Sequence, residues 1–279
     1  MKIAITAEST IDLTKELLEK YDIKTLPFTV ILGDDEYKDG EITSADIFKF
    51  VEENKILPKT SAINEMQYTE FFESVLKDYD AVVHLCLSSE ISSACRNAKL
   101  AESNLQNVYV VDSRSLSTGI ALLAIYAREL ANSGKSAEEI FELCTERTKD
   151  VQASFVVKKL DYLHKGGRCS SIALLGANLL SIRPEIVLND GKMISAKKYM
   201  GKMEKVIEKY CKDVLADNPN PDKKYAFVTY TTATDEMVNI AKSALTNVGF
   251  ETIYETTAGA TITSHCGENT LGVLFLNKN

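Results

Sequence analysis

Residues 81–93 read AVVHLCLSSEISS, an apolar run from Ala81 to Leu87 that is interrupted only by His84 and followed at once by hydroxyl side chains. A short apolar run bounded by turn residues is typical of a strand buried on both faces of a parallel sheet. Alanines then recur at helical spacing at positions 94, 98 and 101. The stretch therefore predicts a buried strand, a polar loop and a close-packed helix, and it leaves His84 as a core residue.

The same unit occurs at two other places in the first half of the chain. Residues 3–7 lead into Ser9 and Thr10, and residues 108–111 lead into a segment from Ser113 to Thr118. In a parallel sheet the carboxyl ends of the strands share one edge, where ligands bind. A single Ser/Thr loop can simply cap a helix. Three such loops at one edge favour a polar binding site.

The second half has a different pattern. Asn189-Asp190-Gly191 lies between two apolar runs and is a strong hairpin signal. Helices from about 203 and 235 and strands at 225–230, 252–254 and 271–276 follow, so a hairpin is combined with crossover connections. This combination predicts a mixed sheet. We place the boundary near residue 155, which gives domains of 1–155 and 156–279.

Several shorter elements complete the prediction. Residues 23–32 read as one strand, 34–40 as a turn, 58–61 as a polar segment, 172–180 as a short apolar helix and 259–270 as a polar loop. Asn64 with Gln67, and Ser136 with Glu139, have the spacing of capping boxes and predict two helix starts.

Residues 160–171, LDYLHKGGRCSS, read as a polar hinge between the two halves. Gly166 and Gly167 allow positive φ and a close approach of the backbone to another group. Lys165 and Arg168 supply cations, and an arginine presents a planar fork to an anion. On its own the segment reads as an ordinary solvated turn.

Composition excludes several classes of protein. The 279 residues contain 45% hydrophobic and 26% charged residues, which is typical of a globular chain rather than a disordered one. A net charge of −8 argues against non-specific nucleic-acid binding. Six scattered cysteines without metal-ligand spacing predict free thiols in a reducing compartment, and the start of the chain lacks the features of a signal peptide. We therefore expect no metal, no transmembrane segment and a cytoplasmic location.

The common catalytic motifs are missing. The sequence contains no G-x-G-x-x-G and no G-x-S-x-G, and Gly134-Lys135-Ser136 lacks the first glycine of a P-loop. His265, in a Thr- and Ser-rich segment before the last predicted strand, is the best placed of the three histidines for a functional role. A hydrolase using a loop serine with His265 and Asp112 stays open.

Six motifs in one order resemble the DegV family, bacterial fatty-acid-binding proteins that include the FakB subunits of fatty acid kinase. The resemblance covers essentially the whole chain. The motifs are Glu8 to Leu13, Lys59-Thr60-Ser61, Leu87 to Ser93, Val111-Asp112-Ser113, Leu160 to Leu163 with Lys165-Gly166-Gly167-Arg168, and His265.

The resemblance implies an N-terminal three-layer α/β/α domain with a parallel sheet and a C-terminal two-layer α/β domain with a mixed sheet. A long-chain fatty acid would be buried between the domains. Carried over to this sequence, the carboxylate-binding residues are Thr60, Ser61, Ser92 and His265. Arg168, with Lys165, would supply charge near the head group, and Ser9, Ser89, Gly166 and Gly167 would lie in the adjoining loops.

The resemblance further implies a carrier without catalytic residues or cofactor. A separate ATP-dependent kinase would phosphorylate the carboxylate that the carrier presents, and brief contact with a membrane surface is left open. A stand-alone serine/histidine hydrolase or phosphotransferase and a lipid-responsive regulatory protein are the alternatives. Glu8, Ala62, Ile63, Ser93 and Cys95 depart from the family pattern, so the head-group geometry is the part of the prediction most exposed to change.

Overall fold

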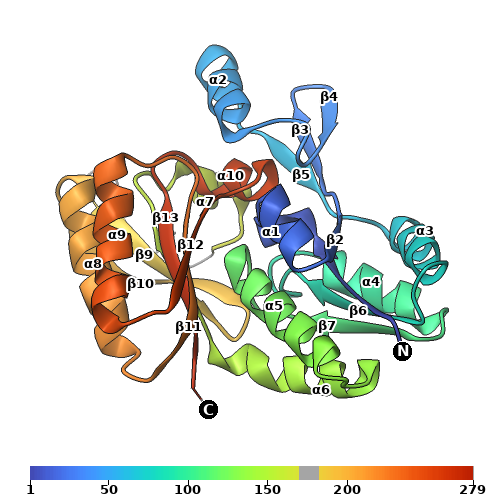
Figure 1. Cartoon of the computed structure of the whole chain (residues 1–279). Helices are drawn as coiled ribbons and strands as arrows, with labels where there is room; N and C mark the ends of the chain where they lie inside the picture. Colours follow the sequence, from blue (N-terminus) through green and yellow to red (C-terminus); the bar gives the residue numbers. More distant parts are fainter. Residues whose placement is uncertain (170–181, 279) are drawn as a thin grey trace.

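The structure of the protein is a computed structural model that describes residues 1–169 and 182–278 (Figure 1). The short apolar helix predicted at 172–180 lies outside the described residues.

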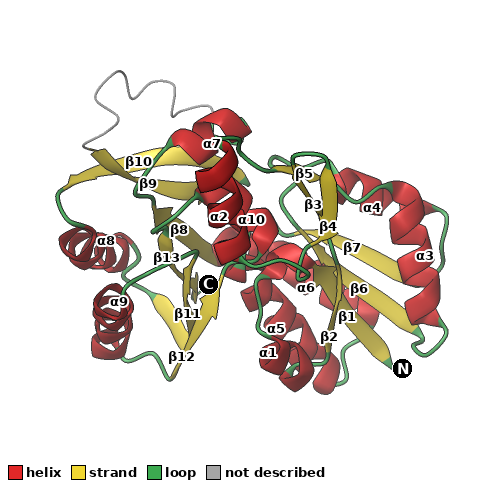
Figure 2. Ribbon diagram, turned by 90° about the horizontal axis from the view of Figure 1, so that it is seen from above, coloured by secondary structure: helices red, strands yellow, loops and turns green. Residues whose placement is uncertain are grey.

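A four-stranded parallel sheet forms the first part of the molecule, with the strand order β2-β1-β6-β7. Helices cover both of its faces, which confirms the predicted three-layer arrangement (Figure 2). The strands are β1 (Ile3–Glu8), β2 (Ile23–Leu26), β6 (Ala81–Cys86) and β7 (Val108–Asp112). The helices are α3 (Glu65–Leu76) and α4 (Ala94–Ser103) on one face, and α1 (Lys15–Lys20), α5 (Thr118–Asn132) and α6 (Ala137–Arg147) on the other.

Burial explains why these strands and helices could be predicted from the sequence. Every residue of β1 and β6 is buried, as the apolar runs predict. The helix α5 is apolar around most of its circumference because it contacts both large sheets of the molecule. The capping boxes at Asn64 and Ser136 are both present at the starts of α3 and α6. The core of the first part thus continues through α5 into the second.

A six-stranded mixed sheet forms the second part, with the order β10-β9-β8-β13-β11-β12. Only β11 and β12 are parallel, and the helices α8 (Met203–Asp217) and α9 (Asp235–Val248) cover the outer face (Figure 2). The strands are β8 (Val151–Val156), β9 (Ile182–Asn189), β10 (Lys192–Met200), β11 (Pro221–Tyr230), β12 (Thr252–Thr257) and β13 (Leu271–Asn277). The predicted mixed sheet and the β9–β10 hairpin are confirmed.

The predicted domain boundary at residue 155 falls within β8, which pairs with β9 and β13 of the mixed sheet. The division of the chain into 1–155 and 156–279 stays a prediction. The short 3-10 helices η1 (Ser9–Ile11) and η2 (Thr148–Asp150) follow β1 and precede β8.

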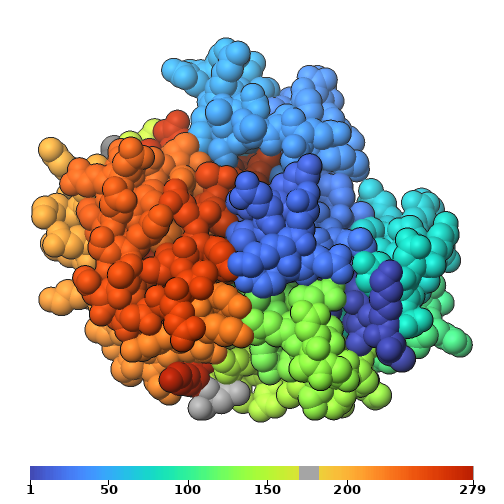
Figure 3. All heavy atoms as spheres, in the orientation of Figure 1, coloured from blue at the N-terminus to red at the C-terminus, as the bar shows by residue number. Residues whose placement is uncertain are grey.

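A third, antiparallel sheet was not predicted. Its order is β4-β3-β5, and with α2 (Ser44–Asn54) it projects above the body of the molecule (Figures 1 and 3). The predicted single strand at 23–32 is wrong, because β2 ends before Pro27 and β3 (Thr29–Leu32) joins the other sheet. The predicted turn at 34–40 contains β4 (Asp35–Lys38), and the polar segment at 58–61 contains β5 (Lys59–Ser61). These two strands are short and largely exposed, so no apolar alternation marks them.

Two short helices replace predicted irregular segments. The hinge contains α7 (Asp161–Gly166), and the loop predicted at 259–270 contains α10 (Ala260–Cys266). Both are too short to display a helical period of apolar residues. They pack against each other, and α10 also contacts α2 and β5. The hinge therefore begins with a helix that supports α10 rather than with a free turn.

Two further observations concern the chain as a whole. All six cysteines are buried, and none of them forms a disulfide with another, as predicted. Within the described ranges, no helix has both the length and the apolar character that crossing a membrane would require.

Candidate ligand-binding site

A cavity of about 590 Å³ opens at the carboxyl-terminal edge of the parallel sheet. This volume lies within the range of about 300–1,000 Å³ that is usual for small-molecule sites. Its wall is formed by β5, the segment after β6, the end of the hinge, β10 and α10. Polar residues on the wall are Thr60, Ser61, Ser89, Glu90, Ser92, Ser93, Arg96, Arg168, Thr261 and His265. Apolar residues are Phe28, Ala62, Leu87, Ile91, Leu116, Met193 and Ile262, together with Cys266.

Thr60 and His265 form a close polar pair on this wall. Thr60 Oγ1 lies 2.8 Å from His265 Nε2. The contact joins β5 of the projecting sheet to α10, and Ser44 on α2 helps to hold α10 through a 2.8 Å contact with Thr263 Oγ1. Two elements that the sequence does not reveal as regular structure therefore bring the pair together.

The imidazole of His265 is neutral near pH 7. Burial, and then the charge of Arg168, lower the pKa of His265 to about 4. Its buried Nδ1 has no hydrogen-bond partner among the described residues. A proton on Nδ1 would lack an acceptor, so the favoured tautomer carries its proton on Nε2 and donates to Thr60 Oγ1. The Thr60 hydroxyl is then free to donate to an anion in the cavity.

Gly166 gives His265 the space that its ring requires. A Cβ at position 166 would lie 2.8 Å from His265 Nδ1, closer than real Cβ contacts allow. The next residue, Gly167, has φ +70° and ends α7 in the left-handed conformation. The two glycines thus have the two properties expected from the sequence, although the close approach is to a histidine side chain.

The predicted serines have different positions. Ser61 and Ser92 both line the cavity, and Ser92 Oγ also accepts from the Ala94 amide at 3.2 Å. Ser89 lines the cavity but donates to Asp112 Oδ2 at 2.6 Å. Ser9 is not part of the wall. Its Oγ instead accepts from the backbone of Phe28, a wall residue, at 3.1 Å.

Of the two predicted cations, one lines the cavity and the other does not. Arg168 lines the cavity, and its Nη1 donates to the Gly166 carbonyl at 2.6 Å. Lys165 is exposed on α7 and is not part of the cavity wall. Arg96, one turn into α4 after the serine segment, lines the cavity and was not predicted. The sequence signal that could have identified Arg96 is its position about one helical turn after the serine segment.

Glu8 anchors the start of the serine segment from beneath. It is fully buried, and its two carboxylate oxygens accept from Tyr68 Oη at 2.6 Å and from the Leu87 amide at 2.8 Å. Burial acts to raise the pKa of Glu8, but His84, Tyr68 and Leu87 together hold it below its usual value. The departure from the family pattern at position 8 thus forms a buried support for Leu87, a wall residue.

The only cluster in the described ranges with the donor spacing of a metal site is formed by Glu8, His84 and Cys86. Both oxygens of Glu8 already accept hydrogen bonds, and His84 Nδ1 lies 2.8 Å from Thr6 Oγ1. His84 Nε2 lies 3.5 Å from Glu8 Oε1. These contacts account for the cluster as a core network, in agreement with the interpretation of His84 as a core residue.

The apolar side of the cavity leads inward. Leu116, Ile262 and Cys266 also line a second, narrow space of about 30 Å³, which reaches Phe155 and Leu274 on the inner face of the mixed sheet. The cavity wall thus combines hydroxyls and cations with apolar side chains, and the narrow space beyond it is lined by apolar residues together with the hydroxyl residues Ser117, Ser154, Thr229, Thr231 and Thr270. An amphipathic ligand with an anionic end and a hydrocarbon tail fits this polarity.

The hydrolase arrangement of a loop serine, His265 and Asp112 is wrong in its geometry. Asp112 accepts from Ser89 and from the Arg114 amide, and His265 contacts Thr60 instead. No carboxylate orients His265 Nδ1 within the described part of the chain. A nucleophile needs a base that a third group holds in place, and that third group is not found here.

Comparison with known proteins adds the family context. Residues 2–278 match the model of the DegV family, whose description is "Uncharacterised protein". A curated relative from Thermotoga maritima, named fatty acid-binding protein, is 32% identical over 284 residues, which cover 98% of this chain and 96% of the relative.

Solved structures are similar over nearly their whole length. A DegV family protein from Thermus thermophilus, described by its fatty acid binding, superposes with a TM-score of 0.92 at 26% identity and covers 100% of both chains. A stearic acid-binding protein from Eubacterium ventriosum gives a TM-score of 0.87 at 26% identity, covering 99% of this chain and 98% of that one.

Proposed function

The chain belongs to the DegV family, and on that premise we propose that it binds a long-chain fatty acid. The observation that carries the proposal is the Thr60–His265 pair on the wall of a cavity that also bears apolar side chains. The carboxylate would accept from the Thr60 hydroxyl and from Ser61 and Ser92, and Arg168 would supply the nearby positive charge. The names of the Thermotoga and Eubacterium relatives support the same ligand class.

The hydrocarbon chain would supply most of the affinity. Each buried methylene contributes about 0.8 kcal/mol, so roughly 15 of them offer about 12 kcal/mol before the costs of binding. A charge-assisted hydrogen bond contributes about 1.5–3 kcal/mol. We therefore assign to Thr60, Ser92 and His265 mainly the orientation of the ligand, with its carboxylate at the mouth.

An exposed carboxylate suits a carrier that delivers its ligand to another protein. We propose that a separate ATP-dependent kinase phosphorylates the bound fatty acid and that this chain contributes no catalytic residue. Arg168 would then stabilise the charge of the acyl phosphate. The sequence lacks a nucleotide-binding motif, which supports this division of labour. The six buried cysteines, which form no disulfide with one another, support a reducing, cytoplasmic location.

Native mass spectrometry of the purified protein tests the binding proposal. We expect a retained species with the mass of a long-chain fatty acid, and stearic acid added to delipidated protein should raise the melting temperature. Methyl stearate, which has the same chain without the charge, should stabilise the protein less. A protein without bound lipid whose melting temperature does not respond to stearic acid would contradict the proposal.

Phosphoryl transfer tests the carrier role separately. Ser92→Ala and His265→Ala should impair phosphorylation of the bound fatty acid by its kinase more than they impair binding of the chain. Equal loss of both would contradict the division between tail and head group. Turnover of acyl esters by the isolated protein would favour a hydrolase, and ligand-dependent partner binding without phosphoryl transfer would favour a regulator.

A further inference from the structure

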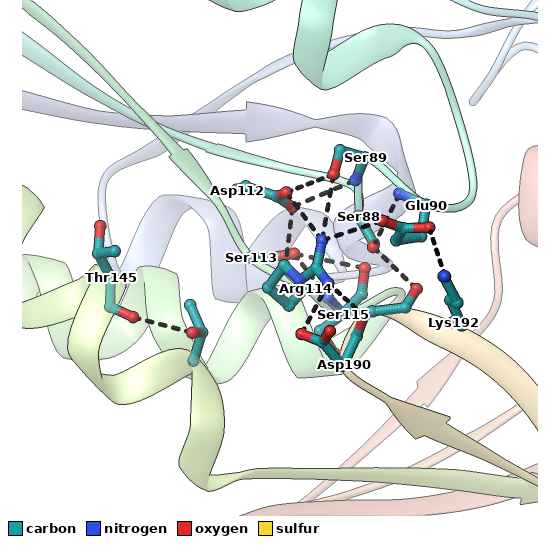
Figure 4. A network of polar contacts seen from close by, with 12 residues as sticks. Ser88, Ser89, Glu90, Asp112, Ser113, Arg114, Ser115, Thr145, Asp190 and Lys192 are labelled. Carbon is teal, nitrogen blue, oxygen red and sulfur yellow. Dashed lines mark hydrogen bonds and ion pairs between the residues drawn. The ribbon is translucent and has the colours of Figure 1, made fainter.

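The tip of the β9–β10 hairpin is fastened to the segment after β6 by a polar network (Figure 4). Arg114 Nη2 donates to both the backbone carbonyl and the carboxylate of Asp190, the latter at 2.7 Å. Ser88 Oγ donates to the Gly191 carbonyl at 2.8 Å. We refer to these contacts of Arg114 and Ser88 with Asp190 and Gly191 as the hairpin clasp.

The clasp is held from below by Asp112 at the end of β7. Its Oδ1 accepts from the amides of Ser89 and Arg114 at 3.2 and 3.1 Å, and its Oδ2 accepts from Ser89 Oγ at 2.6 Å. Arg114 has φ +52°, which is uncommon for a residue with a side chain. Such a conformation persists where surrounding contacts determine it. The guanidinium is therefore aimed at the hairpin by a fixed backbone.

The clasp joins two parts of the cavity wall that belong to different sheets. Ser89, Glu90 and Ser92 line the cavity from the segment after β6, and Met193 lines it from β10, two residues beyond Gly191. Glu90 adds ion-pair contacts of 3.6 Å to Arg114 and 3.4 Å to Lys192. The position of the head-group serines relative to Met193 thus depends on the clasp.

We propose that Arg114 is a positioning residue that slows release of the bound ligand by keeping these two parts of the wall together. Arg114 does not line the cavity, so it acts through Ser89 and Glu90 on one side and through the hairpin on the other. The inference rests on the proposed function, because the ligand in question is the fatty acid.

The contacts with the hairpin backbone are the important ones. The Asp190 side chain is 85% exposed, and an exposed ion pair contributes little to stability. The carbonyls of Asp190 and Gly191 accept bonds that do not depend on the Asp190 carboxylate. Asp190→Asn should therefore change ligand release by less than about twofold. Loss of the Arg114 fork should accelerate release by at least about tenfold.

Gly191 provides an independent way to open the clasp. Its φ is +78°, and an added Cβ would lie 2.5 Å from Ser88 Oγ and 3.0 Å from Arg114 Cζ. Gly201, at the other end of β10, has φ +115°, and no atom of the described residues lies within 4 Å of an added Cβ. Gly191→Ala and Gly201→Ala therefore both introduce an unfavourable backbone conformation, but only the first displaces the clasp.

The experiment measures transfer of radiolabelled stearic acid from the loaded protein to phosphatidylcholine vesicles. We expect release at least about tenfold faster from Arg114→Ala and Gly191→Ala, little rescue by Arg114→Lys, and an unchanged rate for Gly201→Ala. Equal release from all variants and wild type, or equal acceleration by Gly191→Ala and Gly201→Ala, would overturn the inference.

Hydrogen exchange of the ligand-free protein gives a second readout that does not require a ligand. Arg114→Ala should increase amide exchange in residues 88–93 and 190–193, whereas Gly201→Ala should leave residues 88–93 unchanged. Unchanged exchange in Arg114→Ala would overturn the clasp. Wild-type protein that takes up no stearic acid would overturn the proposed fatty acid function instead, so the two failures are distinguishable.

Discussion

Thr60 Oγ1 lies 2.8 Å from His265 Nε2, although 205 positions separate the two residues in the chain. The histidine Nε2–H donates to the threonine, whose own hydroxyl proton then points to an acceptor elsewhere. In this arrangement a neutral histidine fixes the direction in which a threonine offers its proton.

The first prediction concerns this pair. Thr60→Val keeps the shape of the side chain and removes the hydroxyl, so binding of stearic acid should weaken about tenfold or more. The affinity for methyl stearate, which lacks the charge, should fall by less than about threefold, since only a neutral hydrogen bond is lost. Calorimetric titration of both ligands measures the difference. Thr69→Val on α3, whose hydroxyl donates to the Glu65 carbonyl, is the control and should bind both ligands as wild type does.

Alanine substitutions at the two hinge glycines should have different effects on ligand affinity. Gly166→Ala places a Cβ 2.8 Å from His265 Nδ1 and should weaken stearic acid binding, because the ring has to move away from Thr60. In Gly167→Ala the added Cβ meets no atom of the described residues within 4 Å, but position 167 has φ +70°. It should lower the free energy of unfolding by about 1 kcal/mol and leave affinity unchanged. Equal affinities of the two variants would contradict the role given to Gly166.

A pH titration should identify His265 as a neutral group. Its pKa is lowered to about 4 by burial and by Arg168, whereas an unfolded chain protonates histidine near 6.5. The unfolded state therefore binds more protons between these values, and His265 should reduce stability as pH falls from about 6.5 to 4. Urea unfolding of wild type and His265→Gln gives the difference. Stearic acid should raise the pKa of His265, because a carboxylate favours the charged ring.

The contribution of Asp12 to stability should have the opposite dependence on pH from that of His265. Burial is the largest cause that raises its pKa to about 8, against the favourable contacts of Ser117 and Gly259. Between about 4 and 8 the folded state holds a proton that the unfolded state has lost, so stability should decrease as pH rises through this range.

Asp12→Asn should remove that slope. Asn tolerates the positive φ of +54° found at position 12. Urea unfolding at pH 5 and pH 8 compares the two proteins. A slope that persists in the variant would assign the dependence to other groups.

Long or fully buried elements could be predicted from the sequence, and short polar ones could not. The strands β1 and β6 are recognisable because both of their faces are buried. The strand β5 has three residues, and α7 and α10 have six and seven, so no period can be recognised in them. Their conformation depends on tertiary contacts that a local pattern does not contain.

The candidate site also combines features that the sequence predicts with features that depend on tertiary contacts. Hydroxyl loops at strand ends pointed to the edge of the sheet at which the cavity opens, and the family resemblance singled out Thr60 and His265. Arg114 and Asp190 are 76 positions apart, and neither lies in a pattern that indicates a contact. The hairpin turn was predictable from Asn189-Asp190-Gly191, but its attachment to Ser88 depends on how the two sheets are placed.

The position of β13 affects the order in which the two large sheets can form during translation. All four strands of the parallel sheet lie within residues 3–112, so that sheet can form while the rest is still being translated. The mixed sheet cannot close in this way, because β13, the last strand of the chain, lies between β8 and β11. The helix α10 with His265 directly precedes β13. A nascent chain therefore exposes Ser89, Ser92 and Ser93 before α10 and β13 have emerged, and the wall of the cavity is completed only when residues 260–277 have been translated.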